Sequence, residues 1–324
     1  MATIKDVARE AGVSVATVSR VLNKSGYASE DSAQKVMDAI EKLDYQPNSV
    51  ARALFHKTSK MIGLIVPDIT NPFFPELARA VEDVSMIYGY KVLLGNSDGD
   101  SEKEQNYLDL FNQKYVDGII MTSQSSRTDI TLNTNTPIVV LDRANISGLP
   151  TVTSNNYEGA RMAVQLLIEK GAIHIAHIRG PRDVISANDR YQGFIDEMVK
   201  SKMDYVIEES AFNLKEAEEV AHNFFENHGH VDAIFCSNDT IAVGFLKAAL
   251  KRGIQIPSEL QIIGFDGVAF GEMVYPELTT VAQPIYDMGA TASRLLIKLI
   301  EKKEPEQLLY ELKTRIIERG TTRK

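Results

Sequence analysis

Polar and aromatic side chains able to bind hydroxyl groups follow the ends of several short apolar runs in this 324-residue chain. These residues are Asn71, Phe73, Phe74, Asp142, Arg143, Arg190, Asn238, Asp266 and Gln283. Charged groups make strong hydrogen bonds to hydroxyls, and aromatic rings cover apolar C–H faces. If the runs are parallel strands, the side chains meet at one edge of the sheets. The set then predicts a site for a small neutral polyol.

Each of these residues also has a simpler interpretation when it is taken alone. Asn71 could cap a helix, and so could Asp239, which follows Asn238. We interpret Asp239 as a cap or as a supporting residue beside the site. The position of the whole set at the same end of the strands favours a shared site over many separate caps.

A second candidate site lies on a predicted helix from Val15 to Asn23. Ala16, Thr17 and Ser19 are small enough to let this helix approach a groove closely, and Arg20 can reach guanine O6 and N7. A glycine turn precedes the helix, which is typical of a helix-turn-helix motif. The pattern therefore predicts sequence-specific DNA binding.

Two flanking helices are expected to support this reader helix. Thr3 can cap the first of them, with Asp6 completing the capping box, and Gly12 can end it. The third helix, about 30–43, is expected to close a small core through residues at helical spacing. Those residues are Ala33, Val36, Met37, Ile40 and Leu43.

A short helical segment is expected after Pro47, over residues 48–56. Isolated helices below about 12–15 residues are marginal in water. Such a helix can therefore fold or unfold in response to small changes in the spacing of the parts to which it is attached.

From Met61 onward, the sequence alternates short apolar runs with amphipathic stretches. The expected strands are 61–67, 91–97, 117–123, 137–143, 174–180, 232–239 and 261–267, and a further strand end is expected at the 279–282 segment, before Gln283. The expected helices are 73–88, 102–113, 157–170, 190–201, 215–227, 240–251 and 284–302. Repeated βα units predict two doubly wound lobes with parallel sheets.

Charge and composition narrow the classes of function. Residues 1–60 hold nine basic and seven acidic side chains, a net charge of +2. The whole chain carries −9, so the remainder carries −11, which favours a small DNA-binding head on an acidic body. A single cysteine excludes a disulfide framework and fits the cytoplasm. No apolar run is long enough to span a membrane, and no export signal is visible.

No enzyme motif accompanies the polar set. The sequence lacks phosphate-cradling, metalloprotease and nucleophile-elbow motifs, and no cofactor is expected. His174 and His177 fall on opposite faces of a predicted strand, so no metal site is expected there. A sugar-processing enzyme is therefore disfavoured, and the first 60 residues disfavour a secreted sugar receptor.

The stretches IKDVAREAGVSVATVSRVLN and YQPNSVARAL resemble the headpiece and hinge of the LacI/GalR family of bacterial repressors. The resemblance implies that Val15, Ala16 and Arg20 read bases. It implies phosphate contacts by Thr3, Ser14, Thr17, Ser19, Asn23, Tyr27 and Ser32. Asn48, Ala51 and Leu54 would lie in a hinge helix, with Leu54 as a wedge in the minor groove.

The rest of the chain resembles the periplasmic sugar-binding fold that this family shares, and within it the ribose-binding version. The motifs are NPFF, DR, NDRYQGF, SND, GFD and AQP. The resemblance implies that Phe73, Phe74 and Phe212 stack on the sugar. Its hydroxyls and ring oxygen would be bound by Asn71, Asp142, Arg143, Arg190, Asn238, Asp266 and Gln283.

The resemblance also implies the organisation of the chain. An all-α helix-turn-helix headpiece (1–46) and a hinge helix (47–58) would precede an α/β periplasmic-binding-protein-like core (59–324). The first lobe would hold about 60–158 and 288–320, and the second about 159–287. The chain would be a cytoplasmic homodimeric repressor of sugar genes that leaves double-stranded operator DNA when ribose binds. Another sugar, a purine or a phosphoprotein co-repressor stays open as the signal.

Overall fold

The structure is a computed structural model that describes residues 2–23, 26–45, 58–122, 136–142 and 148–324. The chain divides into two compact units, residues 1–59 and 60–324. No helix in these described ranges is long and apolar enough to cross a membrane.

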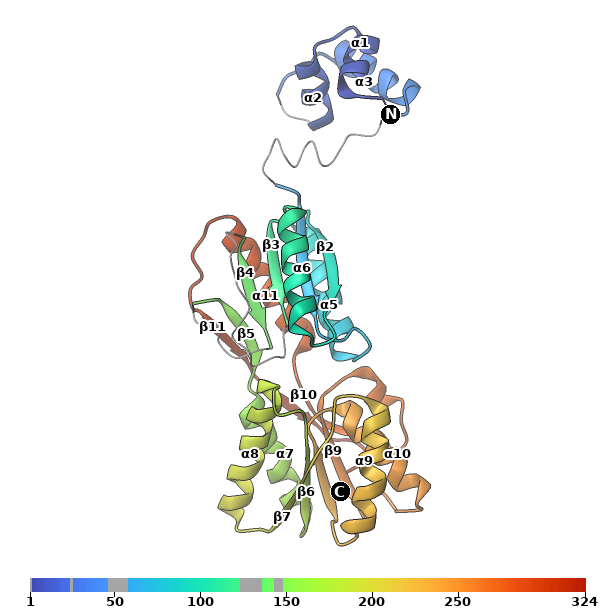
Figure 1. The fold of residues 1–324 in the computed structure, drawn as a ribbon, viewed down its shortest axis with the longest axis vertical. Helices are drawn as coiled ribbons and strands as arrows, with labels where there is room; N and C mark the ends of the chain where they lie inside the picture. The colour runs from blue at the N-terminus through green and yellow to red at the C-terminus, as the bar shows by residue number, and fades with distance from the viewer. Residues whose placement is uncertain (1, 24–25, 46–57, 123–135, 143–147) are drawn as a thin grey trace. The chain divides into compact units, whose positions relative to one another are not determined.

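The described residues of the first unit form three helices, α1 (Ile4–Ala11), α2 (Val15–Asn23) and α3 (Glu30–Lys42) (Figure 1). The Thr3 side chain caps α1 in a capping box with Asp6. Gly12 ends α1 with φ +66°, a left-handed conformation that glycine adopts without steric cost. Both features agree with the sequence prediction.

The core of the first unit is small and aliphatic. Val7, Val18 and Val36 are fully buried, each from a different helix. The prediction for α3 was wrong at Met37, which is 54% exposed, while the unpredicted Ala39 is buried. An amphipathic helix buries only a narrow stripe of residues along one side. In α3 that stripe contains Val36 and Ala39, and Met37 lies outside it. The predicted hinge helix over 48–56 lies outside the described residues.

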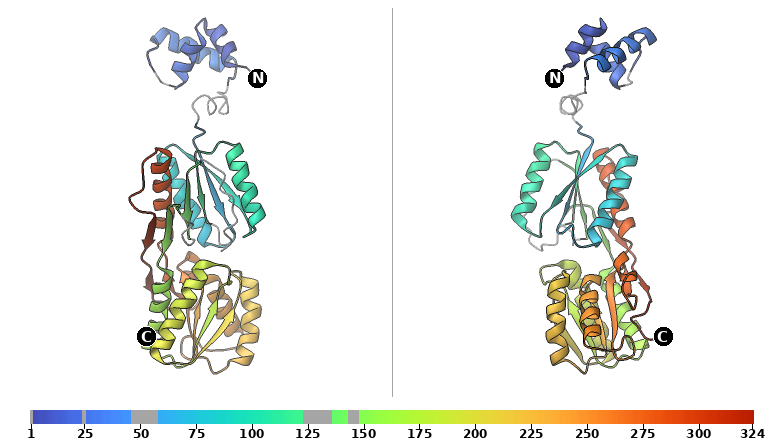
Figure 2. Two further views of the ribbon diagram at one scale, coloured as in Figure 1. Left: turned by 60° about the vertical axis from the view of Figure 1, so that its left-hand side comes forward. Right: turned by 90° about the vertical axis from the view of Figure 1, so that its right-hand side faces the viewer.

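The second unit is built from two sheets with helices on both faces (Figures 1 and 2). In the described residues the first sheet has the order β11-β5-β4-β3-β1-β2 and the second β12-β10-β9-β8-β6-β7. The strands of the first sheet are β1 (Met61–Val66), β2 (Lys91–Asn96), β3 (Gly118–Met121), β4 (Ile138–Leu141), β5 (Thr151–Ser154) and β11 (Leu309–Leu312). Those of the second are β6 (Ile175–Arg179), β7 (Tyr205–Glu209), β8 (Ala233–Cys236), β9 (Gln261–Asp266), β10 (Thr279–Ala282) and β12 (Arg315–Ile317).

Parallel pairing joins all neighbours except β10 and β12, which are antiparallel. Around the first sheet lie α5 (Phe73–Ile87), α6 (Ser101–Gln113) and α11 (Ile285–Ile300). Around the second lie α7 (Asn156–Glu169), α8 (Ile185–Ser201), α9 (Leu214–Asn227), α10 (Asp239–Lys251) and the short 3₁₀ helix η1 (Ala269–Glu272). The predicted fold class of two doubly wound lobes is confirmed.

The sheets are buried on both faces, as parallel sheets usually are. In the first lobe, Leu64 and Ile120 pack with the α5 and α11 helices on one side, and Ile65 and Phe111 pack on the other. In the second lobe, α9 and α10 cover one face of the sheet while α7 and α8 cover the other. This packing fixes the strand ends, from which the candidate site is built.

Within residues 148–324 the chain passes between the lobes three times, after β5, after β10 and after β11. The range 288–320 expected for the first lobe is too long, because β12 pairs with β10 of the second sheet. Beyond β12, the Thr321 hydroxyl donates to the Ile262 carbonyl oxygen at 2.6 Å, so the end of the chain also belongs to the second lobe.

Several elements differ from the predicted pattern. The strands β5, β7, β11 and β12 were not predicted, and α8 begins at Ile185 instead of Arg190. Three of these strands have four residues or fewer, and β5 reads TVTS, too short and polar to stand out as a strand. The first turn of α8 holds no acidic residue, and its N-cap Val184 makes no side-chain cap, so the usual start signal is absent.

Candidate functional site

Residues from both lobes of the second unit line one small cavity. The first lobe contributes Asn71, Phe73, Phe74 and Asp142, and the second contributes Ser186, Arg190, Phe212, Asn238 and Asp266. Eight of these nine residues were predicted from the sequence, and Ser186 was missed. Its signal is weak, because a serine in the first turn of a helix is ordinary. Of the remaining predicted residues, Gln283 bonds to Asp266, and Arg143 lies outside the described residues.

The aromatic side of the cavity comes from the start of α5. The rings of Phe73 and Phe74 lie edge to face, with centroids 5.1 Å apart. Asn71 holds the turn before the helix, because its Oδ1 accepts a hydrogen bond from the Phe73 N–H at 3.2 Å. Asn71 therefore does partly act as a local cap, as the simpler interpretation proposed, while it also lines the cavity.

Phe212 reaches the cavity from the loop after β7 because Gly180 leaves space for it. A Cβ built on Gly180 would lie 2.4 Å from the Phe212 ring, closer than such contacts occur. A side chain at position 180 would therefore push the ring out of its place.

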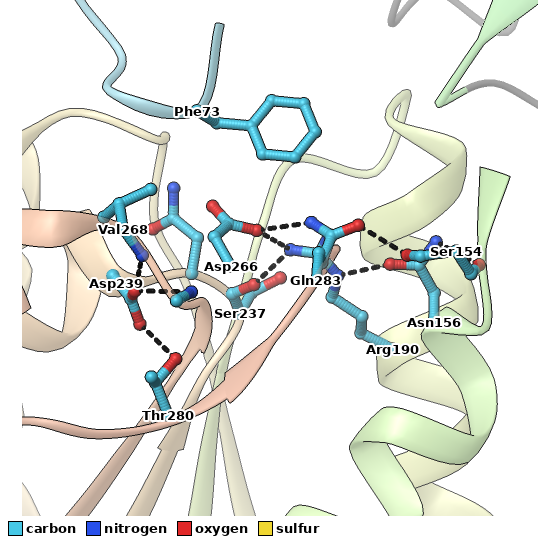
Figure 3. A network of polar contacts seen from close by, with 12 residues as sticks. Phe73, Ser154, Asn156, Arg190, Ser237, Asp239, Asp266, Val268, Thr280 and Gln283 are labelled. Atoms are coloured by element: carbon cyan, nitrogen blue, oxygen red, sulfur yellow. Dashed lines mark hydrogen bonds and ion pairs between the residues drawn. The ribbon is translucent and has the colours of Figure 1, made fainter. Parts of the chain in front are cut away.

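Arg190 is the buried cation of the site (Figure 3). Its Nη1 lies 3.3 Å from Asp266 Oδ1 and donates to the Ser237 carbonyl oxygen at 2.6 Å. Its Nε donates to Asn156 Oδ1 at 2.8 Å, and the guanidinium lies 3.8 Å above the Phe265 ring centroid. A charge this deeply buried is stable only when it is paired and hydrogen-bonded, and Arg190 is both.

Asp266 ends β9 in a strained backbone conformation. Its φ is +108°, where non-glycine residues are rare, and Gly267 follows at +80°. The next turn is tied down by Asp239, whose Oδ2 accepts from the N–H groups of Gly267 (2.8 Å) and Val268 (2.9 Å). Thr280 donates to Asp239 Oδ1 at 2.6 Å. The interpretation of Asp239 as a supporting residue fits these contacts, whereas the cap of α10 is Asn238, through Ile241 N–H.

Burial raises the pKa values of the three carboxyls in and under the site. The pKa of Asp266 rises to about 6, although Arg190 and the Gln283 amide oppose the shift. The pKa of Asp239 rises to about 8, through burial and the neighbouring Asp266. The pKa of Asp142 rises to about 7 through burial, with Arg190 opposing and Asp266 adding to the shift. Asp142 Oδ1 is a buried acceptor with no hydrogen-bond partner among the described residues.

The raised pKa of Asp142 predicts how the stability of the fold changes with pH. An unfolded Asp titrates near 3.9, so between about pH 4 and 7 the folded chain keeps a proton that the unfolded chain releases. Stability contributed by Asp142 is therefore lost as pH rises to about 7. Asp142→Asn carries no charge and tolerates the left-handed φ of +54°. Relative to wild type, its free energy of unfolding should rise by roughly 1–2 kcal/mol from pH 5.5 to pH 8.

Urea unfolding of both proteins at the two pH values measures this difference. Buried His177, whose pKa is lowered to about 3, loses stability in the opposite direction as pH falls below about 6.5. His177 is present in both proteins, so its contribution cancels. Parallel pH profiles for wild type and Asp142→Asn would contradict the burial argument.

In the first unit, α2 presents the residues predicted to contact DNA. Val15 is 41% exposed, Ala16 and Arg20 are also exposed, and Val18 on the opposite side is fully buried. Ser14 accepts a hydrogen bond from the Thr17 N–H at 3.1 Å and so starts the helix. Thr3 and Ser32 lie at helix starts, and Tyr27 is 86% exposed. The Asn23 side chain and Asn48, Ala51 and Leu54 lie outside what the structure describes.

No group of three or more histidine, cysteine or acidic side chains in the described ranges is placed to hold a metal ion. The residues that line the cavity offer hydrogen bonding by carboxylate, guanidinium and amide groups, together with ring stacking.

Family comparisons match both units. Residues 3–48 match the family described as "Bacterial regulatory proteins, lacI family". Residues 59–316 match "Periplasmic binding proteins and sugar binding domain of LacI family". The chain belongs to the LacI family. Together with the full-length relatives described next, these matches confirm the predicted function as a sugar-responsive DNA-binding repressor and not an enzyme.

Individual LacI-family proteins resemble the chain along its length. The ribose operon repressor of Halalkalibacterium halodurans is 51% identical, with 100% of this chain and 98% of the relative covered. The ribose operon repressor of Bacillus subtilis is 42% identical, with 100% and 99% covered. A periplasmic binding protein/LacI transcriptional regulator from Alkaliphilus metalliredigens, complexed with D-xylulofuranose, superimposes with a TM-score of 0.76. It is 38% identical and covers 81% of this chain and 99% of its own.

Proposed function

We propose that this LacI-family chain is a cytoplasmic homodimeric repressor of ribose utilisation genes and that ribose releases it from its operator. The observation that carries the proposal is the convergence of eight predicted sugar-binding residues on one cavity. Two full-length relatives that are ribose operon repressors support ribose as the effector. The pentulofuranose in the Alkaliphilus regulator supports a five-carbon sugar.

The chemistry of the cavity suits a furanose. Asp142 and Asp266 can accept hydrogen bonds from vicinal hydroxyls, and Arg190 can donate to a ring or hydroxyl oxygen. Phe73 lies across the gap from Asp266 and Gln283, where its ring can cover an apolar face of the sugar (Figure 3). The unpartnered Oδ1 of Asp142 gains a donor when a hydroxyl reaches it, which offsets the cost of its burial.

The position of the cavity between the two lobes links sugar binding to a change of shape. Its lining comes from both lobes, so a sugar that contacts all of these residues holds the lobes in one arrangement. A ligand that prefers one arrangement of the lobes shifts the population toward that arrangement.

We expect this shift in the arrangement of the lobes to change how the headpiece and the hinge bind DNA. We place the DNA-binding headpiece at 1–46, the hinge helix at 47–58 and the effector-binding core at 59–324. In the headpiece, Arg20 reads a base edge, and Val15 and Ala16 contact thymine methyl groups. Leu54 is assigned as the wedge in the minor groove, on the sequence resemblance alone. The alternatives are another sugar, a purine or a phosphoprotein co-repressor, and the test below separates the first two from ribose.

Calorimetric titration of the full chain tests the effector. We expect saturable one-to-one binding of ribose per protomer, and no heat with galactose or hypoxanthine at the same concentration. Ribose 5-phosphate should bind at least tenfold more weakly than ribose, because the buried carboxylates repel its phosphate. Binding of hypoxanthine with none of ribose would replace ribose by a purine as the effector.

A further inference from the structure

The buried Arg190–Asp266 ion pair of the second lobe is connected to the first lobe through Ser154. Arg190 and Asp266 belong to the second lobe, on α8 and β9, and Ser154 is the last residue of β5 in the first sheet. Ser154 is 2% exposed. An amide side chain connects it to each member of the pair, Gln283 to Asp266 and Asn156 to Arg190 (Figure 3).

The Gln283 connection has a defined polarity. The Ser154 hydroxyl donates to Gln283 Oε1 at 2.5 Å, and Gln283 Nε2 donates to Asp266 Oδ1 at 2.8 Å. A primary amide has an acceptor end and a donor end of nearly the same shape. With the acceptor end occupied by the Ser154 hydroxyl, the donor end faces the Asp266 carboxylate. The reverse orientation would set an amide oxygen against that carboxylate.

The Asn156 connection has the opposite polarity and reaches the opposite charge. Asn156 Nδ2 donates to the Ser154 backbone oxygen at 3.1 Å, and Asn156 Oδ1 accepts from Arg190 Nε at 2.8 Å. Asn156 begins α7 and is 3% exposed. The Asn156 amide therefore donates to the Ser154 carbonyl and accepts from the Arg190 guanidinium, so each end of the amide meets a partner of the matching kind.

We propose that Ser154 is a positioning residue for the sugar site, which sets the orientation of Gln283 and thereby presents Asp266 to the ligand. The proposal rests on the proposed sugar-binding function of this cavity. Ser154 is not among the residues that line this cavity, although it lines the adjoining pocket that shares Asp142 and Ser186 with it; its connection to Asp266 runs through Gln283. Because Gln283 leads from β10 into α11 and Asn156 follows β5, the same contacts hold the pair at two of the three chain crossings between the lobes.

Ser154→Ala removes the hydroxyl while its backbone oxygen still accepts from Asn156. The Gln283 amide is then free to turn, and Asp266 loses a donor that favours its charged form. The other charged groups facing Asp266 are Arg190, Asp239 and Asp142. We expect ribose affinity at pH 7 to fall by about 5- to 10-fold, the effect of one buried hydrogen bond. The deficit should shrink as pH rises from 6 to 8, because Asp266 regains its charge at the higher pH.

Ribose calorimetry at pH 6, 7 and 8 measures both effects. Ser293→Ala is the matched control, because Ser293 is a fully buried serine of the first lobe whose hydroxyl donates only within α11, to the Gly289 carbonyl oxygen. This control should keep wild-type affinity at each pH. Ser154→Thr retains the hydroxyl and should restore most of the affinity.

A double-mutant cycle with Gln283→Ala separates positioning from a general structural role. If Ser154 acts through Gln283, adding Ser154→Ala to Gln283→Ala should change ribose affinity less than 2-fold. Full additivity of the two substitutions, or a Ser154→Ala deficit equal at all three pH values, would overturn the proposal. Absence of ribose binding by the wild-type protein would instead overturn the proposed function, which the same titration reports.

Discussion

Replacement of Arg190 by methionine is expected to abolish ribose binding and to destabilise the core more than any other single change at the site. Methionine fills a similar length but leaves Asp266 without its cation, and it leaves Asn156 Oδ1 and the Ser237 carbonyl without a donor. Removing one partner of a buried pair typically costs about 3–5 kcal/mol. Urea unfolding at pH 7 should show a loss of that size.

The loss should be smaller at pH 5. Without Arg190 the pKa of Asp266 rises further above its ordinary value, because the guanidinium is the main group that opposes the effect of burial. Protonation at low pH then removes the unpaired charge. Arg161→Met is the matched control, because Arg161 pairs with Glu158 and Glu197 on the same lobe at 25% exposure. It should cost about 1 kcal/mol or less. Ribose affinity of Arg190→Met within 3-fold of wild type would contradict the assigned role.

Replacement of Arg20 by alanine is expected to weaken binding to operator DNA and to relax the choice of one base pair. The α2 face that includes Val15, Ala16 and Arg20 is exposed, and of these three only Arg20 can donate to a base edge. Loss of one bidentate contact costs about 1–3 kcal/mol, or roughly 5- to 150-fold in affinity.

Duplexes selected from random sequence by the wild-type protein supply the operator, and fluorescence anisotropy at fixed salt measures affinity. Selected and scrambled duplexes are compared for each variant. Arg9→Ala is the matched control, because Arg9 lies exposed on α1 and pairs with Asp6. It should leave the ratio of selected to scrambled affinity unchanged. An equal loss on both duplexes by Arg20→Ala would show that Arg20 contacts only phosphate.

The sequence was sufficient to predict the alternation of strands and helices, because the long elements carry clear apolar periodicity. β1, β9 and α11 are examples, and their bounds differ from the predicted ones by only a few residues. The short strands were missed for a physical reason. β11 and β12 gain their strand conformation from pairing with neighbours far along the chain, and pairing of that kind leaves no local signal.

The lining residues of the site were predictable because charged and aromatic side chains at strand ends are conspicuous. Asp142, Arg190 and Asp266 could be named without knowing how they bond. Ser154 and Asn156 could not, since an uncharged serine and asparagine beside a short strand are also typical of an ordinary turn. Their importance comes from hydrogen bonds across more than thirty residues of sequence, from Asn156 to Arg190 and from Ser154 to Gln283.

Under the proposed function, sugar bound in this cavity controls the affinity of the headpiece for DNA. The most direct test is the affinity of the full chain for a selected operator duplex, measured by anisotropy with and without saturating ribose. Ribose should weaken operator binding saturably, by roughly 5- to 150-fold. Asp142→Ala, which removes an acceptor from the cavity, should bind the operator like wild type but need far more ribose for release. Wild-type operator affinity that stays the same at saturating ribose, or release of Asp142→Ala at wild-type ribose concentrations, would contradict the account.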